Sequence, residues 1–167
     1  KEAFDLAVQN RQKNNLQVAE NLYREILKTN PDHFESIFDL GALLALTKRF
    51  DLAKPLLQKA IQINPNYADV YYNIGIAFYE LGEYQKAINS YQKAIQINPN
   101  YSEAYWNLHL FASDINEALT VLKKLHEIDN KHIKAKIMIS ALQGFKGNFN
   151  EFNTLVASSE SKHPYMR

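Results

Sequence analysis

The sequence has no cysteine and few glycines, and these absences exclude several kinds of site. Its 167 residues include no cysteine, so neither disulfides nor thiolate metal ligands are available. The five glycines are scattered along the chain, at Gly41, Gly75, Gly82, Gly144 and Gly147. The chain therefore lacks the glycine-rich loop that cradles phosphate groups, and it also lacks the Gly-x-Ser-x-Gly motif of a nucleophilic serine.

Long apolar runs and blocks of like charge are absent as well. No apolar stretch approaches the roughly 20 residues of a membrane-spanning helix, and no signal peptide is visible. The net charge is only +1, which argues against a surface for nucleic acid or membrane lipids. The five histidines show no metal-ligand spacing. We therefore expect a cytoplasmic protein that is not an enzyme by itself, has no cofactor, binds no nucleic acid and inserts into no membrane.

An internal repeat is the strongest feature that the sequence does contain. Residues 58–67 recur letter for letter as residues 92–101, at an offset of 34 residues. Pro31, Pro65 and Pro99, each preceded by asparagine, close the first three repeats. Between them the apolar residues recur every three or four positions, which predicts two helices per repeat. A period of this length indicates a stack of helix pairs.

Particular residues also mark the break between the two helices of a repeat. Gly82 stands at this break in the third repeat, where a left-handed helix end favours glycine. Asn14 holds the equivalent position in the first repeat, and asparagine tolerates that conformation. Lys48 holds this position in the second repeat, and a left-handed backbone is less favourable for lysine.

These residues resemble the tetratricopeptide repeat (TPR) family. The aromatic, Leu-Gly, aromatic, Ala, aromatic and Pro pattern of the family is matched by Tyr71, Ile74, Gly75, Phe78, Ala87, Tyr91 and Pro99. The resemblance implies an all-α fold, a right-handed superhelical α-solenoid of about five helix-turn-helix repeats. It predicts a single TPR domain over residues 1–167, with repeats at 1–33, 34–67 and 68–101 and degenerate repeats at 102–132 and 133–166.

The fourth repeat departs from the pattern in a way that predicts a shorter helix. Its alanine column resumes at Ala118, three residues early, so its first helix should be about one turn short. His109 replaces the glycine of the family pattern. We interpret His109 as filling the space that opens where the shortened helix packs less closely on the second helix of its repeat.

The resemblance implies that the first helix of each repeat lines a concave groove. Three columns of equivalent residues would then face that groove. One column is aromatic, one is aliphatic and lies four residues later on the same helical face, and one consists of Asp and Asn. The predicted ligand-groove residues are Phe4, Phe38, Asp39, Ala42, Tyr72, Asn73, Ile76, Trp106, Asn107 and Leu110. Asparagine there could both donate to and accept from a peptide backbone. The alternative is that these columns reflect repeat consensus and local packing.

Charge separates the predicted first helices from the second helices. Residues 34–46, 68–81 and 102–114 contain no lysine or arginine, whereas the second helices carry many cations. The predicted acidic rim of the groove consists of Glu35, Asp69, Glu80 and Glu103. A basic or amphipathic protein segment with apolar anchors is the expected ligand. The alternative is that these charges are an ordinary solvated surface.

Two further functional hypotheses stay open beside the leading one, a protein-interaction scaffold. Lys1 is not an initiator methionine and no polar capping helix follows the last predicted helix, so we expect a fragment of a longer protein. The chain could be the substrate-presenting arm of a larger bacterial glycosyltransferase or methyltransferase. It could also form a homo-oligomer through Phe149 and Phe152 at its uncapped end. The high content of asparagine, lysine and isoleucine is the basis for expecting a bacterial source.

Overall fold

The computed structural model of the chain describes residues 2–144, and this part is helical throughout, with no strand. The chain divides into two compact units, Lys1–Pro99 and Asn100–Arg167, referred to below as the N-terminal and C-terminal units. The helices of the N-terminal unit are α1 (Glu2–Gln12), α2 (Leu16–Thr29), α3 (Phe34–Leu46), α4 (Phe50–Ile63), α5 (Ala68–Glu80) and α6 (Tyr84–Ile97). Those of the C-terminal unit are α7 (Ser102–Leu108), the 3₁₀ helix η1 (His109–Phe111), α8 (Ile115–Ile128) and α9 (Ile133–Gly144). The predicted all-α repeat fold is confirmed, and the single domain over residues 1–167 stays a prediction.

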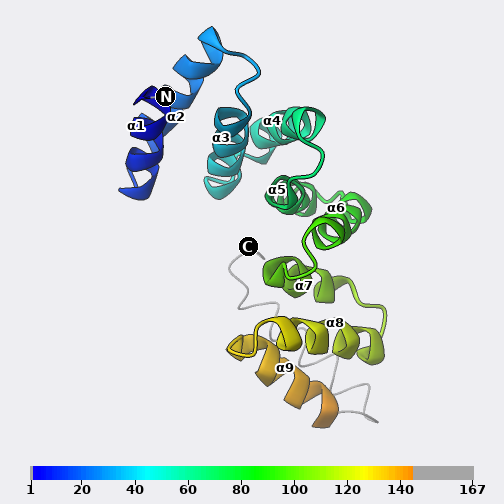
Figure 1. Ribbon diagram of the computed structural model, residues 1–167. Helices are drawn as coiled ribbons and strands as arrows, with labels where there is room; N and C mark the ends of the chain where they lie inside the picture. Colours follow the sequence, from blue (N-terminus) through cyan, green and yellow to red (C-terminus); the bar gives the residue numbers. More distant parts are fainter. Residues whose placement is uncertain (1, 145–167) are drawn as a thin grey trace. The chain divides into compact units, whose positions relative to one another are not determined.

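The N-terminal unit is a stack of three helix pairs. Within each pair the first helix packs on the second, and the pairs meet through α2 on α3 and α4 on α5. The first helices α3 and α5 also pack on each other. Figure 1 shows α3 and α5 on one side of this unit and α4 and α6 on the other. The predicted alternation of first and second helices is therefore present.

The same turn closes the first helix of each pair. Asn14, Lys48 and Gly82 have φ angles of 61°, 60° and 75°, so all three adopt the left-handed conformation predicted for them. In each turn the following amide N–H reaches back five residues, as from Asn15 to the Asn10 carbonyl at 2.8 Å. This hydrogen bond is the signature of a Schellman turn. A backbone strain that glycine avoids is therefore present at Lys48.

The core of the N-terminal unit is built from the repeated columns. Ala19, Ala53 and Ala87 are fully buried. A Cβ atom added to Gly75 would lie 2.6 Å from the Tyr91 ring, and one added to Gly41 would lie 3.0 Å from Leu57. The glycine column is therefore where the two helices of a pair approach most closely.

Ion pairs join neighbouring helix pairs at equivalent positions. Glu20 in α2 accepts from Arg49 Nη1 at 2.6 Å, and Lys54 in α4 donates to Glu83 at 2.8 Å. Glu20 and Lys54 are 34 residues apart, and so are Arg49 and Glu83. The two bonds therefore occupy the same place in successive repeats but have opposite polarity.

The C-terminal unit begins with the shortened helix that the sequence predicts. Helix α7 ends at Leu108 after seven residues, whereas α3 and α5 each have 13. His109 in η1 is buried, its ring lies 4.4 Å from that of Trp106, and its Nδ1 contacts the Trp106 carbonyl oxygen. The interpretation that His109 fills space beside a shortened helix agrees with this packing.

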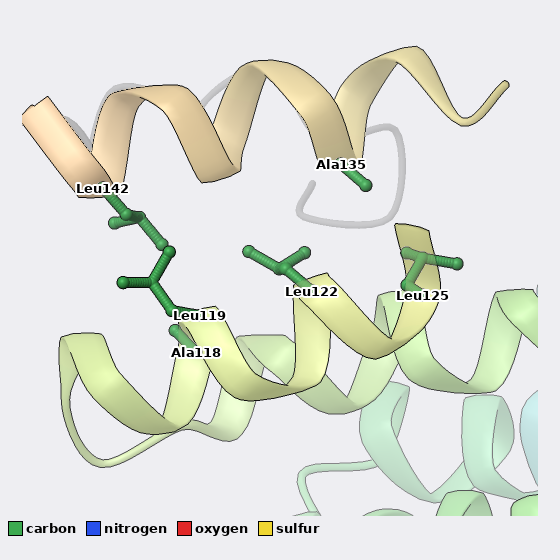
Figure 2. Close-up of a cluster of buried hydrophobic side chains, with 6 residues drawn as sticks. All are labelled: Ala118, Leu119, Leu122, Leu125, Ala135 and Leu142. Atoms are coloured by element: carbon green, nitrogen blue, oxygen red, sulfur yellow. The ribbon is translucent and has the colours of Figure 1, made fainter. Parts of the chain in front are cut away.

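Helices α8 and α9 share one apolar cluster. Its buried members are Ala118, Leu119, Leu122, Leu125, Ala135 and Leu142. Figure 2 shows the leucines of α8 pointing toward Ala135 and Leu142 of α9. Helix α9 falls within the predicted fifth repeat, whereas Phe149 and Phe152 lie outside the described residues.

Candidate functional site

The predicted groove residues of the N-terminal unit lie on one helical face but are not fully exposed. Phe4, Phe38 and Tyr72 are each half-buried, and Ala42 and Ile76 are half-buried as well. Because α3 packs against α5, the columns that start at Phe38 and Tyr72 run along neighbouring helices. The arrangement offers partial apolar exposure on α3 and α5, and neither of these two helices contains lysine or arginine.

The other predicted groove residues, Trp106, Asn107 and Leu110, belong to the C-terminal unit and are half-buried there. Trp106 packs beside the α8–α9 cluster, so part of its ring has a structural role. The candidate surface is therefore built from α3 and α5 alone, together with the turn between α4 and α5.

Three of the four aromatics of the groove column pack on a ring in the turn that leads to the next first helix. Phe4 contacts His33 with ring centroids 5.4 Å apart, and Phe38 contacts Tyr67 at 5.2 Å. In the C-terminal unit Trp106 contacts His132 at 5.0 Å. Sequence reasoning missed these partners, although a ring stands 29 residues after both Phe4 and Phe38. The aromatic column thus holds these turns in place as well as facing solvent.

Two of these turn residues also cap helices. His33 Nδ1 accepts from the Ser36 amide at 3.2 Å, and His132 Nδ1 accepts from the Ala135 amide at 3.1 Å. An acceptor at this position satisfies one of the amides that the first turn of a helix leaves without a partner. Both imidazoles therefore act as helix-capping acceptors. Residues 2–144 contain no cluster of three or more side chains that could hold a metal ion.

Asp39 is buried inside the N-terminal unit. Tyr23 Oη donates to Asp39 Oδ2 at 3.1 Å, and Arg11 Nη1 lies 3.5 Å from Asp39 Oδ1. Burial raises the pKa of the Asp39 carboxyl, and Arg11 and the Tyr23 hydrogen bond offset only part of that rise. Asp39 joins α3 to the preceding helix pair, so its carboxylate already has partners within the fold.

Replacing Asp39 with asparagine is expected to leave stability at neutral pH within about 1 kcal/mol of wild type, because asparagine still accepts from Tyr23 and carries no buried charge. The raised pKa of Asp39 means that the folded protein binds its proton more tightly than the unfolded chain. The stabilisation from this proton is complete below the unfolded-state pKa and is lost as pH rises through the folded-state pKa. Urea unfolding at about pH 4 and pH 7 should therefore show wild type gaining relative to Asp39→Asn at acid pH. If wild type and Asp39→Asn differ in stability by the same amount at both pH values, the raised pKa of Asp39 is contradicted. Asp39→Ala is the control, because it leaves the Tyr23 hydroxyl without the acceptor that Asp39 provides.

The remaining predicted polar residues differ in their exposure and in their partners. Asn73 Nδ2 donates to the Asp69 carbonyl oxygen at 2.8 Å, so the asparagine predicted to bind a ligand backbone also supports its own helix. Glu35 is exposed, whereas Asp69 and Glu80 are half-buried. Burial raises the pKa of Glu80, and Lys48 opposes the rise. Glu103, the fourth predicted rim residue, is exposed on the C-terminal unit.

No helix in residues 2–144 combines the length and the apolar character needed to span a bilayer.

Comparison with known proteins supports the repeat assignment. A tetratricopeptide repeat model matches residues 68–101, and a TPR repeat model matches residues 49–82. Comparison with curated protein sequences gives no significant match.

Solved structures share the fold. A crystal structure of MamA protein is 25% identical, covers 96% of this chain and 91% of its own chain, and has a TM-score of 0.76. A MamA structure designated MSR-1 is 26% identical, covers 77% of this chain and 76% of its own, and has a TM-score of 0.66. A mutant O-GlcNAc transferase of Thermobaculum terrenum is 21% identical over 75% of this chain and 25% of its own, with a TM-score of 0.71, a likeness of fold alone. The two family matches show that the chain contains tetratricopeptide repeats at residues 49–101, and the stacked helix pairs agree with that assignment.

Proposed function

We propose that the chain is a protein-interaction scaffold that binds a basic or amphipathic segment of a partner along α3 and α5. The observation that carries this proposal is the combination of half-buried apolar columns with an excess of carboxylates on two adjacent helices. Phe38 and Ala42 lie on α3, and Tyr72 and Ile76 lie on α5. Lysine and arginine are absent from both helices, whereas Glu35, Asp69 and Glu80 are present. A fourth carboxylate, Asp39, is buried against Tyr23 and Arg11.

Recognition would divide between apolar contact and charge. A partner side chain that covers Ile76 or the Tyr72 ring removes apolar area from water, and buried aromatic and aliphatic anchors contribute most of the binding energy at interfaces. Acidic groups at the edge favour a basic segment and disfavour an acidic one, so charge would select the ligand more than it would strengthen binding. Tyr72 also contacts the Tyr91 ring at 6.0 Å, so Ile76 is the better residue to mutate.

The proposal can be tested by selecting peptides from a displayed random library on the immobilised chain. We expect the selected peptides to be enriched in lysine, arginine and apolar residues. Ile76→Lys should weaken their binding by about tenfold or more, since it removes an anchor and repels a basic ligand. The matched control is Ile88→Lys on α6, because lysine is already present at the equivalent position of the preceding repeat, Lys54.

Two results would contradict the proposal. One is a set of selected peptides with no basic enrichment, or with acidic enrichment. The other is equal loss of binding in Ile76→Lys and Ile88→Lys, because the effect would then reflect general charge and not the α3–α5 surface. Circular dichroism on both variants verifies that the helices remain folded.

A further inference from the structure

Three aromatic side chains gather where α3 begins. Phe34 and Phe38 lie one helical turn apart, with ring planes inclined by 10° and centroids 6.4 Å apart. Tyr67, in the turn before α5, is nearly perpendicular to both, with its centroid 5.2 Å from each. All three side chains are half-buried, so each keeps some contact with solvent. We call Phe34, Phe38 and Tyr67 the α3 aromatic triad.

Carboxylates surround this triad from two helices. Glu35 follows Phe34 on α3 and is exposed, and Asp69 lies in the first turn of α5. Burial raises the pKa of the Tyr67 phenol, and the Asp69 carboxylate raises it further through its charge and by accepting a hydrogen bond from the phenol. The carboxylates of Asp39 and Glu35 add smaller contributions in the same direction. The negative field of three carboxylates therefore reaches the Tyr67 hydroxyl.

The cationic groups nearby offset only part of this field. Arg11 Nη1 lies 3.5 Å from Asp39, on the buried side of α3. His33 Nδ1 lies 3.7 Å from Glu35 Oε2, but the same nitrogen accepts from the Ser36 amide and therefore carries no proton. Glu35 thus has no ion pair with His33 in this state.

Another aromatic ring of the N-terminal unit, that of Phe78, already has cationic side chains of the same chain beside it. The Nζ atoms of Lys54 and Lys86 lie 6.0 Å and 5.5 Å from the centroid of the Phe78 ring. In the part of the chain that the structure describes, no lysine or arginine lies over the triad in this way. Within residues 2–144, two lysines therefore lie over Phe78, and no lysine or arginine lies over the triad.

We propose that the α3 aromatic triad, with Glu35 and Asp69, is a subsite for one lysine or arginine side chain of the bound segment. This inference rests on the proposed function and adds a specific recognition point to it. The π face of an aromatic ring attracts a cation within about 6 Å of its centroid, and a carboxylate beside the ring strengthens that attraction. An uncharged side chain of the same length gains only the apolar contact.

The test uses small probes that carry the side-chain chemistry alone. Butylammonium stands for lysine, propylguanidinium stands for arginine, and 1-butanol is the uncharged control. The complete chain with ¹³C-labelled aromatic residues is titrated with each probe and followed by NMR. We expect saturable shifts at Phe34, Phe38 and Tyr67 with at least one cation, and binding about two- to fivefold tighter than 1-butanol. The stronger of the two cations then identifies the preferred residue.

Two variants and a matched control sharpen the result. Phe38→Leu should weaken cation binding about two- to fivefold, and Asp69→Asn should weaken it while leaving 1-butanol unaffected. Phe50→Leu is the control, because Phe50 is a half-buried phenylalanine at the start of α4, outside the triad. The subsite is refuted if 1-butanol binds the triad as tightly as both cations, or if Phe38→Leu behaves like Phe50→Leu.

Failure of the subsite is distinguishable from failure of the proposed function. Selected peptides that lose binding in Ile76→Lys, together with cations that do not shift the triad, would overturn the subsite alone. Cations that bind the triad, together with peptides unaffected by Ile76→Lys, would support a cation site and overturn binding along α3 and α5.

Discussion

Replacing Leu122 with alanine should lower the free energy of unfolding of the C-terminal unit by about 2–5 kcal/mol. Leu122 is fully buried at the centre of the cluster between α8 and α9 (Figure 2). Removing its branched end leaves a cavity as well as losing transfer energy, and the size of the loss depends on how far the neighbouring side chains can fill that cavity. Hydrogen exchange of the α8 and α9 amides measures the loss where it occurs.

The matched control for this change is Ile137→Ala on α9. Ile137 is 65% exposed, so its truncation removes little buried area and should change stability by less than about 0.5 kcal/mol. An equal loss of protection in the two variants would show that α9 does not pack on α8 through Leu122.

The second large effect is expected at the point of closest helix approach. Gly75→Ala should destabilise the N-terminal unit by about 1–3 kcal/mol, because its Cβ would lie 2.6 Å from the buried ring of Tyr91. Gly41→Ala should cost less, since the neighbouring Leu57 atoms lie at 3.0 Å and belong to a flexible side chain. Urea unfolding of both variants gives the comparison.

A double mutant isolates the cause of the Gly75 effect. Leu57 stands in the second repeat where Tyr91 stands in the third, so Tyr91→Leu imports a side chain that the fold already uses. The cost of Gly75→Ala should be smaller in the Tyr91→Leu background than in wild type. Equal costs in the two backgrounds would exclude the ring contact as the cause and indicate a backbone effect.

The 34-residue period of the sequence predicts most of the fold. The predicted first helix at residues 34–46 has the same bounds as α3, because the Asn-Pro turn and the left-handed residue Lys48 act locally and recur at fixed positions. A shorter first helix was also predictable, since the loss of three residues before Ala118 moves the whole register. The α-helix itself is shortened by more than the predicted turn, from 13 residues in α3 to seven in α7, because the chain continues as the 3₁₀ helix η1. These signals lie in the chain itself and do not depend on tertiary packing.

The exposure of the candidate surface was not predictable in the same way. Periodicity places Phe38 on a helical face, but its exposure depends on Tyr67, a ring contributed by a distant turn. Asp39 fits a ligand-binding column by its position, yet it lies against Tyr23 and Arg11 of the preceding repeat. A repeat pattern specifies which residues share a face, whereas burial depends on side chains from neighbouring repeats that vary independently.

The opposite polarity of the two ion pairs between repeats has a consequence for how the chain avoids misassembly. The second and third repeats have the same helix order and the same turn positions, so a folding chain could dock α2 against α5 of the third repeat in place of α3. Such a skip would bring Glu20 to the position of Glu83, and two carboxylates would meet where Arg49 normally neutralises one of them. The correct neighbour gains a charge-assisted hydrogen bond, and the wrong neighbour meets repulsion. The opposite polarity of the two ion pairs therefore helps the chain to distinguish the second repeat from the third during folding.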